Sequence, residues 1–195
     1  MSCRISGRRV VLALACTLSL SAAPAAAADF VDYDQNSPRW GAKTYRPGGT
    51  MAATGCGPTA VAMAVRHLTG DRDVGPMTIA NRFGRRYHLR YGGSYHSLIP
   101  VAGRAYGLRV RAIHTDLNRA RRSIERGGLV VALVTGRPFT WGGHFIVLNG
   151  FRDGRFRISD PNRNNNHLER RGFSSSQLRA GGVSKMWTYA QRSDS

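Results

Sequence analysis

The sequence predicts an α+β domain in which N-terminal helices pack on an antiparallel β-sheet. Segments with helical spacing of apolar residues come first, and segments with strand-like composition cluster late in the chain. This segregation favours an α+β architecture over a doubly wound one, in which strands and helices alternate throughout. The chain has 195 residues, which suits a leader segment followed by one domain with a substantial core.

The best helical segment runs from Pro58 to Thr69, within the stretch MAATGCGPTAVAMAVRHLTG. Its apolar residues fall at helical spacing, and Pro58 suits the first turn because its missing N–H costs no intrahelical hydrogen bond there. Gly70 is suited to the C-terminal end of the helix. Residues 29–55 are rich in Gly, Pro, Asn and Thr, so we expect them to form an irregular arm.

Three further segments are expected to be helical. Pro76–Phe83 has the pattern of a short helix, and Ser97–Gly107 is weakly helical because Pro100 interrupts it. Asp116–Arg126 is a stronger candidate, with Asp116 as the expected N-cap. Five later segments have the composition of strands, namely Leu108–Ile113, Leu129–Val134, His144–Phe151, Arg155–Asp160 and Ser184–Tyr189.

The first 28 residues are typical of a secretory signal peptide. Three arginines precede the apolar run Val10–Leu20, and small residues lead to an expected cleavage after Ala28. The run is too short to span a bilayer, and no later stretch approaches the roughly 18 consecutive apolar residues of a membrane anchor. GRRVVLA also resembles a twin-arginine export signal, and Ala15-Cys16 is a weak match to a lipoprotein cleavage site. Plain secretion of residues 29–195 as a single domain is the favoured interpretation.

The chain is strongly basic. It holds 29 Lys and Arg against 11 Asp and Glu, a formal net charge of +18, and Lys43 and Lys185 are its only lysines. A basic exported protein is expected to adhere to anionic polymers, whether cell-wall, membrane-surface or nucleic acid. The charge indicates where the protein adheres and leaves its chemistry open.

Cysteine usage points to chemistry. Cys3 and Cys16 lie in the expected signal peptide, so the exported chain would keep only Cys56 and could form no intrachain disulfide. A lone thiol in an oxidising compartment is open to oxidation or mispairing, which favours a chemical role. The alternative is a buried, inert cysteine.

Cys56 lies at the expected start of a helix, which favours a thiolate. Unpaired amides and the helix dipole stabilise an anion at an exposed helix N-terminus by about 0.3 to 1 kcal/mol. That contribution lowers a thiol pKa by less than about one unit, because one unit corresponds to roughly 1.4 kcal/mol. A neighbouring base is therefore still required.

His144 is the best candidate for that base. It begins a strand directly after Gly142 and Gly143, which would let a partner approach closely. If Arg152-Asp153-Gly154 forms a three-residue loop, Asp160 falls opposite Ile146 and on the face of His144. A two-residue turn would shift the register by one residue and put Asp160 on the other face.

The hydrophobic pattern favours the first register. The face of His144 then carries Asp160 and four apolar residues, Ile146, Leu148, Phe156 and Ile158. We expect this face to pack on the Pro58 helix and bring the imidazole to the sulfur, with the carboxylate orienting the imidazole. Each residue also has an ordinary interpretation: Cys56 as core, His144 as a strand-end histidine, and Asp160-Pro161-Asn162 as a turn. The combination favours chemistry.

Three blocks, GCGPTAVAMAV, GHFIVLNGF and ISDPN, give the chain a family resemblance. Their order and spacing resemble the bacteriocin-leader-processing cysteine peptidase family, particularly its stand-alone exported relatives, and the resemblance extends from about residue 33 to 189. It implies a papain-like cysteine peptidase fold and a peptide or protein substrate, with no cofactor and no metal. It also implies Cys56 as the nucleophile, His144 as the general base and acid, and Asp160 as the residue that orients His144.

The resemblance implies one further residue. The family places a glutamine before the cysteine. The side-chain amide of this glutamine helps the backbone amide of the nucleophile to stabilise the oxyanion. Gln35 in YDQNSPRW is the match. From composition alone, Gln35 could equally be a surface polar residue in a flexible arm.

Several rival functions stay open. A cell-wall peptide amidase or an acyl transferase would use the same triad, because the acyl-thioester step is common to these reactions. A basic polyanion-binding module without catalysis is suggested by Arg82–His96, where arginines and tyrosines interleave as in a platform for single-stranded nucleic acid. Zinc is disfavoured because Cys56, His88, His96 and His114 show no recognisable ligand spacing.

Overall fold

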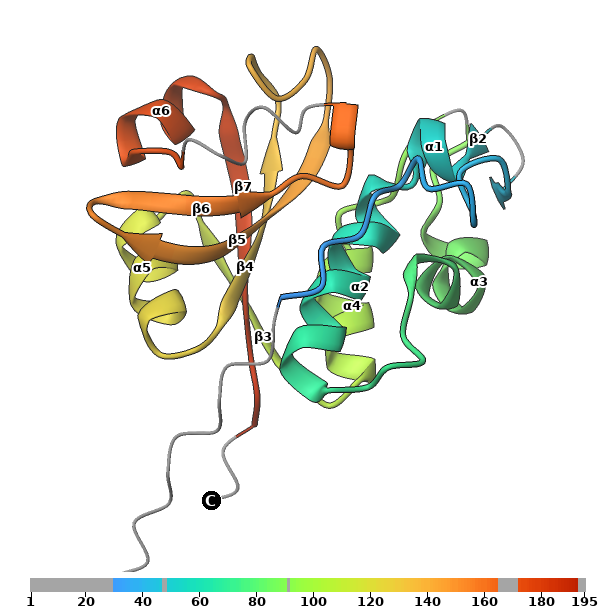
Figure 1. The fold of residues 1–195 in the computed structure, drawn as a ribbon, viewed down its shortest axis with the longest axis horizontal. Helices are drawn as coiled ribbons and strands as arrows, with labels where there is room; N and C mark the ends of the chain where they lie inside the picture. Colours follow the sequence, from blue (N-terminus) through green and yellow to red (C-terminus); the bar gives the residue numbers. More distant parts are fainter. Residues whose placement is uncertain (1–29, 47–48, 91, 165–171, 193–195) are drawn as a thin grey trace, which may run out of the picture.

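Five antiparallel strands form one sheet, in the spatial order β3-β7-β4-β5-β6 (Figure 1). The structure is a computed structural model and describes residues 30–46, 49–90, 92–164 and 172–192. The strands of the sheet are β3 (Arg109–His114), β4 (Leu129–Val134), β5 (His144–Arg152), β6 (Arg155–Ser159) and β7 (Val183–Ala190). The expected signal peptide, residues 1–28, lies outside the described residues.

A layer of helices covers one face of the sheet. It consists of α1 (Met51–Thr54), α2 (Cys56–Thr69), α3 (Pro76–Tyr87) and α4 (Leu98–Ala105), preceded by the short strand pair β1 (Thr44–Arg46) and β2 (Gly49–Thr50). Helix α2 packs on strand β5 and on helices α3 and α4, and eleven of its residues are buried. A helix that is enclosed on several sides buries residues around most of its circumference. This explains why small and branched residues of α2 are buried outside the predicted apolar face.

The second face of the sheet is also covered. It packs on α5 (Leu117–Glu125) and on α6 (Ser175–Ala180), and the core between them includes Ile146, Leu148 and Leu178. The core on the α2 side includes Phe145 and Val147 instead. Strand β5 is therefore apolar on both sides, because each side faces a covering layer.

The predicted α+β fold is confirmed, with helices packed on an antiparallel sheet. The five strand predictions agree with the structure to within about one or two residues at each end, the usual spread for element ends. The prediction that Pro100 interrupts its helix is wrong: Pro100 is the third residue of α4, where its missing N–H has no intrahelical acceptor to lose. Asp116 caps α5 as expected, accepting a hydrogen bond from Arg119 N at 2.9 Å.

The turn between β5 and β6 differs from the favoured prediction. Arg152 pairs with Arg155, so Asp153 and Gly154 form a two-residue turn with positive φ angles of 52° and 74°. The register then shifts where Asn149 forms a bulge, and Leu148 pairs with Ile158. The bulge restores the register that the three-residue loop would have given. The turn prediction is wrong, yet the end of β6 pairs with β5 as expected: Ser159, the residue before Asp160, pairs with Val147.

The predicted packing of the hairpin face is also wrong. Ile146, Leu148, Phe156 and Ile158 lie in the core beneath α5 and α6, on the side of the sheet away from α2. The sequence pattern could not choose between the two faces, because both faces of β5 are apolar. His144 is the first residue of the strand, so its side chain lies at the end of the sheet.

Within the described part of the chain, no helix has both the length and the apolar character needed to cross a membrane.

Helix α4 packs closely on the sheet at Gly103. A Cβ atom at this position would lie 2.5 Å from Tyr189 Cε1 and 2.7 Å from Val110 Cγ2. Tyr189 cannot give way easily, because it is buried and its hydroxyl donates to the carbonyl oxygen of Ile99. Gly103 therefore sets the distance between the helical layer and the sheet.

We expect Gly103→Ala to lower the free energy of unfolding by about 1–3 kcal/mol, because the methyl group overpacks this interface. Equilibrium unfolding in urea measures the change. Gly142→Ala is the matched control, since a Cβ there meets no atom within 4 Å, and we expect it to change stability by less than about 0.5 kcal/mol. A Gly103→Ala protein as stable as wild type would contradict the tight contact.

Candidate functional site

Cys56 is the first residue of helix α2. The helix begins two residues earlier than predicted, with Gly55 as its N-cap and Pro58 in the first turn. The sulfur therefore belongs to the turn whose amides have no intrahelical acceptors, at the positive end of the helix dipole. Cys56 is buried, with 8% of its surface exposed, and it is a free cysteine.

Both glycines beside Cys56 lie where a side chain does not fit. A Cβ at Gly55 would lie 2.4 Å from the carbonyl oxygen of Met51 in α1. A Cβ at Gly57 would lie 2.5 Å from Ser94 Oγ, whose hydroxyl is hydrogen-bonded to the Tyr45 hydroxyl at 2.8 Å. The first turn of α2 is thus held closely between α1 and the segment before α4, which fixes the position of the sulfur.

His144 and Asp160 form a buried hydrogen-bonded pair. His144 Nε2 lies 2.6 Å from Asp160 Oδ1, and the two residues are 7% and 0% exposed. The His144 imidazole also lies close enough to the Cys56 thiol to lower its pKa. Because Asp160 occupies Nε2, Nδ1 is the ring nitrogen that remains for the sulfur. The structure thus brings together Cys56, His144 and Asp160 from the start of a helix, the start of one strand and the end of another.

Asp160 is held by the turn that follows it. Its Oδ1 accepts a hydrogen bond from the backbone N–H of Asn162 at 2.8 Å, the pattern of an Asx turn. The ordinary interpretation of Asp160-Pro161-Asn162 as a turn is therefore correct. It is compatible with the contact to His144, because the same carboxylate serves both.

Burial and charge act in opposite directions on the thiol. Burial raises the pKa of Cys56, whereas the hydrogen bond from His144, the positive charge of His144 and the backbone N–H of Phe145 lower it, and the lowering contributions win. Burial lowers the pKa of His144, but its hydrogen bonds to Asp160 and Cys56 raise it above the ordinary value for histidine. Both shifts favour a thiolate beside an imidazolium.

Gln35 lies next to the segments that carry Cys56 and Asp160. Its backbone N–H donates to the carbonyl oxygen of Pro161 at 2.7 Å, and its side-chain Nε2 donates to the carbonyl oxygen of Ala52 at 2.6 Å. Gln35 is 5% exposed, so it is not a surface residue of a flexible arm. The arm has no helix or strand before β1, as predicted, but the prediction is wrong for its second half, where β1, β2 and α1 form. Hydrogen bonds of Gln35 also fasten the arm to the rest of the domain.

One contributor to the site carried no sequence signal that we used. The Phe145 N–H acts on Cys56 through its backbone, which residue identity does not reveal.

The histidines considered for zinc do not gather. His88 lies against the Tyr45 ring, with ring centroids 4.6 Å apart, and His96 Nδ1 lies 3.2 Å from Lys185 Nζ. Among the residues that the structure describes, no group of three or more His, Cys, Asp or Glu is arranged to hold a metal ion.

Two of the three described aromatic residues in the segment Arg82–His96 pack against the core, so they offer no exposed stacking surface. Phe83 is buried, and Tyr87 packs against the core around α2. Tyr95 is exposed, and the position of Tyr91 lies outside the described residues. The interleaving of arginine and tyrosine follows from helix α3, which directs its aromatic residues inward and its arginines outward.

Two solved structures share this fold. A Bacillus anthracis protein described as a C39-like peptidase is 18% identical, with a TM-score of 0.51 over 72% of this chain and 90% of that chain. The peptidase domain of Streptococcus ComA, a bi-functional ABC transporter involved in a quorum sensing pathway, is 15% identical, with a TM-score of 0.51 over 71% of this chain and 92% of that chain. These likenesses confirm the papain-like fold. No curated protein is significantly similar to the chain in sequence.

A family model agrees with the resemblance inferred from the three sequence blocks. The model described as the Peptidase_C39 like family matches residues 29–193, nearly all of the chain. The match includes the first turn of α2, the start of β5 and the end of β6. The chain therefore belongs to the Peptidase_C39 like family and is a cysteine peptidase.

Proposed function

We propose that this protein is an exported cysteine peptidase that cleaves a peptide bond through an acyl-thioester on Cys56. One observation carries the proposal: Cys56, His144 and Asp160 are all buried, His144 Nε2 lies 2.6 Å from Asp160 Oδ1, and the His144 imidazole is close enough to the Cys56 thiol to lower its pKa. A nucleophile, a base and a carboxylate that orients the base are the groups that acyl transfer requires. Export is proposed from the basic, apolar and small-residue pattern of residues 1–28.

In the proposed mechanism, the Cys56 thiolate attacks the carbonyl carbon of the scissile amide, and the C=O pair of electrons moves to oxygen. When the tetrahedral intermediate collapses, the C–N bond breaks and the His144 imidazolium gives its proton to the leaving amine. The neutral imidazole then removes a proton from water, and the resulting hydroxide attacks the thioester carbon. Breaking of the C–S bond releases the carboxylic acid product and restores the thiolate.

The oxyanion needs hydrogen-bond donors that are fixed before the reaction begins. We assign this role to the backbone N–H of Cys56 and the side-chain amide of Gln35. Cys56 N is a first-turn amide of α2, without an intrahelical acceptor. The Gln35 Nε2 carries two hydrogens, and its hydrogen bond to the Ala52 carbonyl oxygen uses one of them. The second hydrogen is available to substrate.

The proposal is tested by digestion of a peptide library and of cell-wall peptides with wild type and Cys56→Ala. We expect wild type to release new amino termini from peptides and Cys56→Ala to release none, because the acyl-thioester cannot form without the sulfur. Mass spectrometry of the products identifies the bonds that are cleaved. Cleavage by Cys56→Ala at the wild-type rate would contradict the mechanism. Release of non-peptide amides alone would assign the site to an amidase.

The pH dependence of thiol alkylation tests the ion pair. Because the thiolate is the reactive form, a lowered pKa moves the rise in alkylation rate to lower pH, so we expect wild type to plateau below the ordinary thiol pKa of about 8.5. His144→Ala removes the hydrogen bond and the positive charge while Cys56 stays buried, so its midpoint should move upward. Iodoacetamide labelling followed by mass spectrometry gives both midpoints. An unchanged midpoint would remove His144 as the activating group.

Gln35→Ala tests the oxyanion assignment. We expect turnover to fall by about 10² to 10³, the usual effect of removing one oxyanion donor, with little change in substrate binding. Gln191→Ala is a matched control, because the Gln191 Nε2 also donates to a backbone carbonyl oxygen, that of Leu68 at 2.6 Å, near the end of α2 opposite Cys56. Thermal unfolding of both variants separates lost chemistry from lost structure. Unchanged turnover in Gln35→Ala would exclude it from the site.

A further inference from the structure

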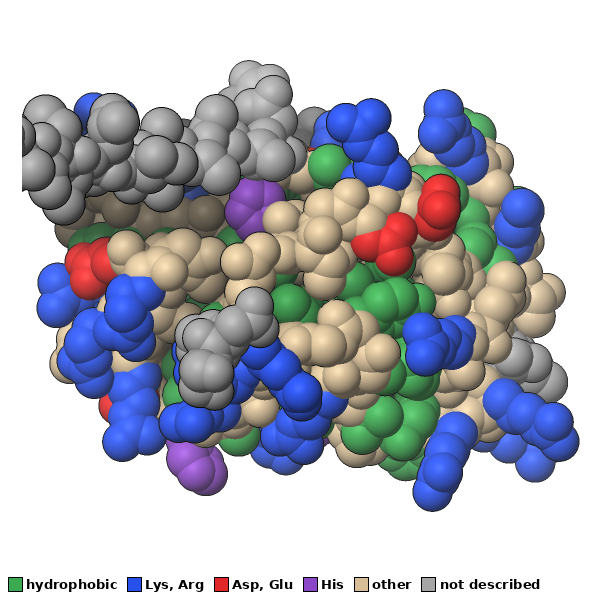
Figure 2. All heavy atoms as spheres, turned by 90° about the horizontal axis from the view of Figure 1, so that it is seen from below, with side chains coloured by type: hydrophobic (Ala, Val, Ile, Leu, Met, Phe, Trp, Pro, Cys, Tyr) green, Lys and Arg blue, Asp and Glu red, His purple; other side chains and the backbone are tan. Residues whose placement is uncertain are grey.

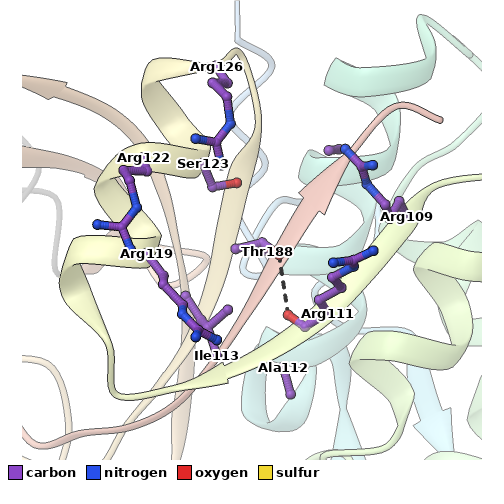
Figure 3. Close-up of a pocket in the computed structure, with 10 residues that line it drawn as sticks. Arg109, Arg111, Ala112, Ile113, Arg119, Arg122, Ser123, Arg126 and Thr188 are labelled. Atoms are coloured by element: carbon purple, nitrogen blue, oxygen red, sulfur yellow. Dashed lines mark hydrogen bonds between the residues drawn. The ribbon is translucent and has the colours of Figure 1, made fainter. Parts of the chain in front are cut away.

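A groove between β3 and α5 is lined mainly by arginine. It encloses about 670 Å³ and lies on the face of the sheet that α5 covers (Figure 3). Figure 3 shows arginines on both walls, with Thr188 of β7 between them. All five are exposed: Arg109 and Arg111 from β3, Arg119 and Arg122 from α5, and Arg126, the C-cap of α5.

The secondary structure explains why the arginines face one another. Arg109 and Arg111 are two residues apart on a strand, so they share a face and are separated by roughly 6.6 Å along it. Arg122 lies in α5 and Arg126 is the C-cap of that helix, so the two side chains are one helical turn apart, about 6 Å along its axis. Each wall therefore presents a pair of arginines with nearly the same spacing.

The positive charge in this groove is poorly compensated. Among the described residues, the one ion pair that involves these arginines joins Arg119 to Asp116, at 3.3 Å. No acidic side chain lines the groove. Figure 2, which views the molecule from below Figure 1, shows many basic and few acidic side chains on that face. Like charges on facing walls repel, and a concave surface concentrates their field, so an anion in the groove would relieve the repulsion.

We propose that this groove binds a linear, flexible polymer that carries phosphate groups and no nucleobases. The planar guanidinium donates two parallel hydrogen bonds to a phosphate, and all five basic residues here are arginines. The arginine pairs on the two walls have similar spacing, which fits a chain with regularly spaced charges. No aromatic side chain lines the groove, so it offers no stacking surface for single-stranded nucleic acid. A concave site with few apolar residues also fits a flat membrane surface poorly.

The groove is separate from the peptidase site. The peptidase site lies at one end of the sheet, where Val134 of β4 pairs with His144 of β5 and with Val183 at the start of β7. Arg109 pairs with Ala190, at the other end of β7 and on the edge of the sheet opposite β6. Substitutions in the groove should therefore leave peptide cleavage unchanged, and the two proposals can fail independently.

The experiment measures binding of a poly(glycerol phosphate) of about ten units by fluorescence anisotropy across salt concentrations. The groove variant carries Arg109→Gln, Arg111→Gln, Arg122→Gln and Arg126→Gln. We expect its affinity to fall by at least about tenfold, and the slope of log K against log salt to decrease by roughly 3, because four phosphate contacts are lost. The double variant Arg122→Gln with Arg126→Gln should give about half of this change in slope, which keeps the test valid if the quadruple variant is unstable.

A matched control carries Arg85→Gln, Arg86→Gln, Arg152→Gln and Arg179→Gln, four exposed arginines outside the groove. It loses the same formal charge, so we expect it to keep affinity within about threefold. Equal losses in the groove and control variants would overturn the proposal in favour of general charge attraction. Groove-dependent binding that is tighter to a (dT)₁₀ oligonucleotide or to phosphatidylglycerol vesicles would overturn the assigned polymer class. Peptide cleavage is measured on every variant.

Discussion

The proposed chemistry depends on one packing constraint: the first turn of α2 must lie against the end of the sheet where β5 begins. Neither layer carries a complete site. The helix brings the sulfur and the sheet brings the imidazole and the carboxylate, so the distance between layers decides whether the sulfur meets its base. Gly55 and Gly57 allow the close approach at one end of the interface, and Gly103 allows it where α4 meets β7. Dense packing converts these local contacts into a fixed geometry, because a filled interior has little room for the layers to slide.

Burial makes the site both costly and effective. Removing a thiolate and an imidazolium from water is unfavourable unless each charge finds a partner. Here each has one: the sulfur lies near the imidazole and the Phe145 N–H, and the imidazole is held by Asp160. The carboxylate is in turn fixed by the Asn162 amide. A chain of paired groups in a region of low dielectric gives strong electrostatic interactions at the reacting atoms, which is the usual source of rate in such sites.

Local sequence patterns supplied most of the element order and three candidate site residues, Cys56, His144 and Asp160. Gln35 came from the family resemblance alone. The helix after Cys56 has helical spacing and an N-terminal proline, and Asp116 is a typical N-cap. The faces of β5 could not be assigned, since Phe145 and Ile146 are equally apolar and only tertiary packing separates them. The Asn149 bulge was also invisible, because it depends on cross-strand contacts. Asp160 was nevertheless aligned correctly, since the bulge offset the turn that had been predicted wrongly.

The arm before β1 contacts a turn that lies far along the chain. Gln35 and Asn36 bind the turn after β6, and the contact between Asn36 and Asn162 spans 126 positions of the sequence. Contacts of this range form slowly, because a long stretch of chain must be ordered before they are made. Cys56 likewise meets its base only when the distant strand β5 is in place. Activation of the thiol therefore depends on tertiary structure: an unfolded chain carries an ordinary thiol, because the residues that lower its pKa are far away in the sequence.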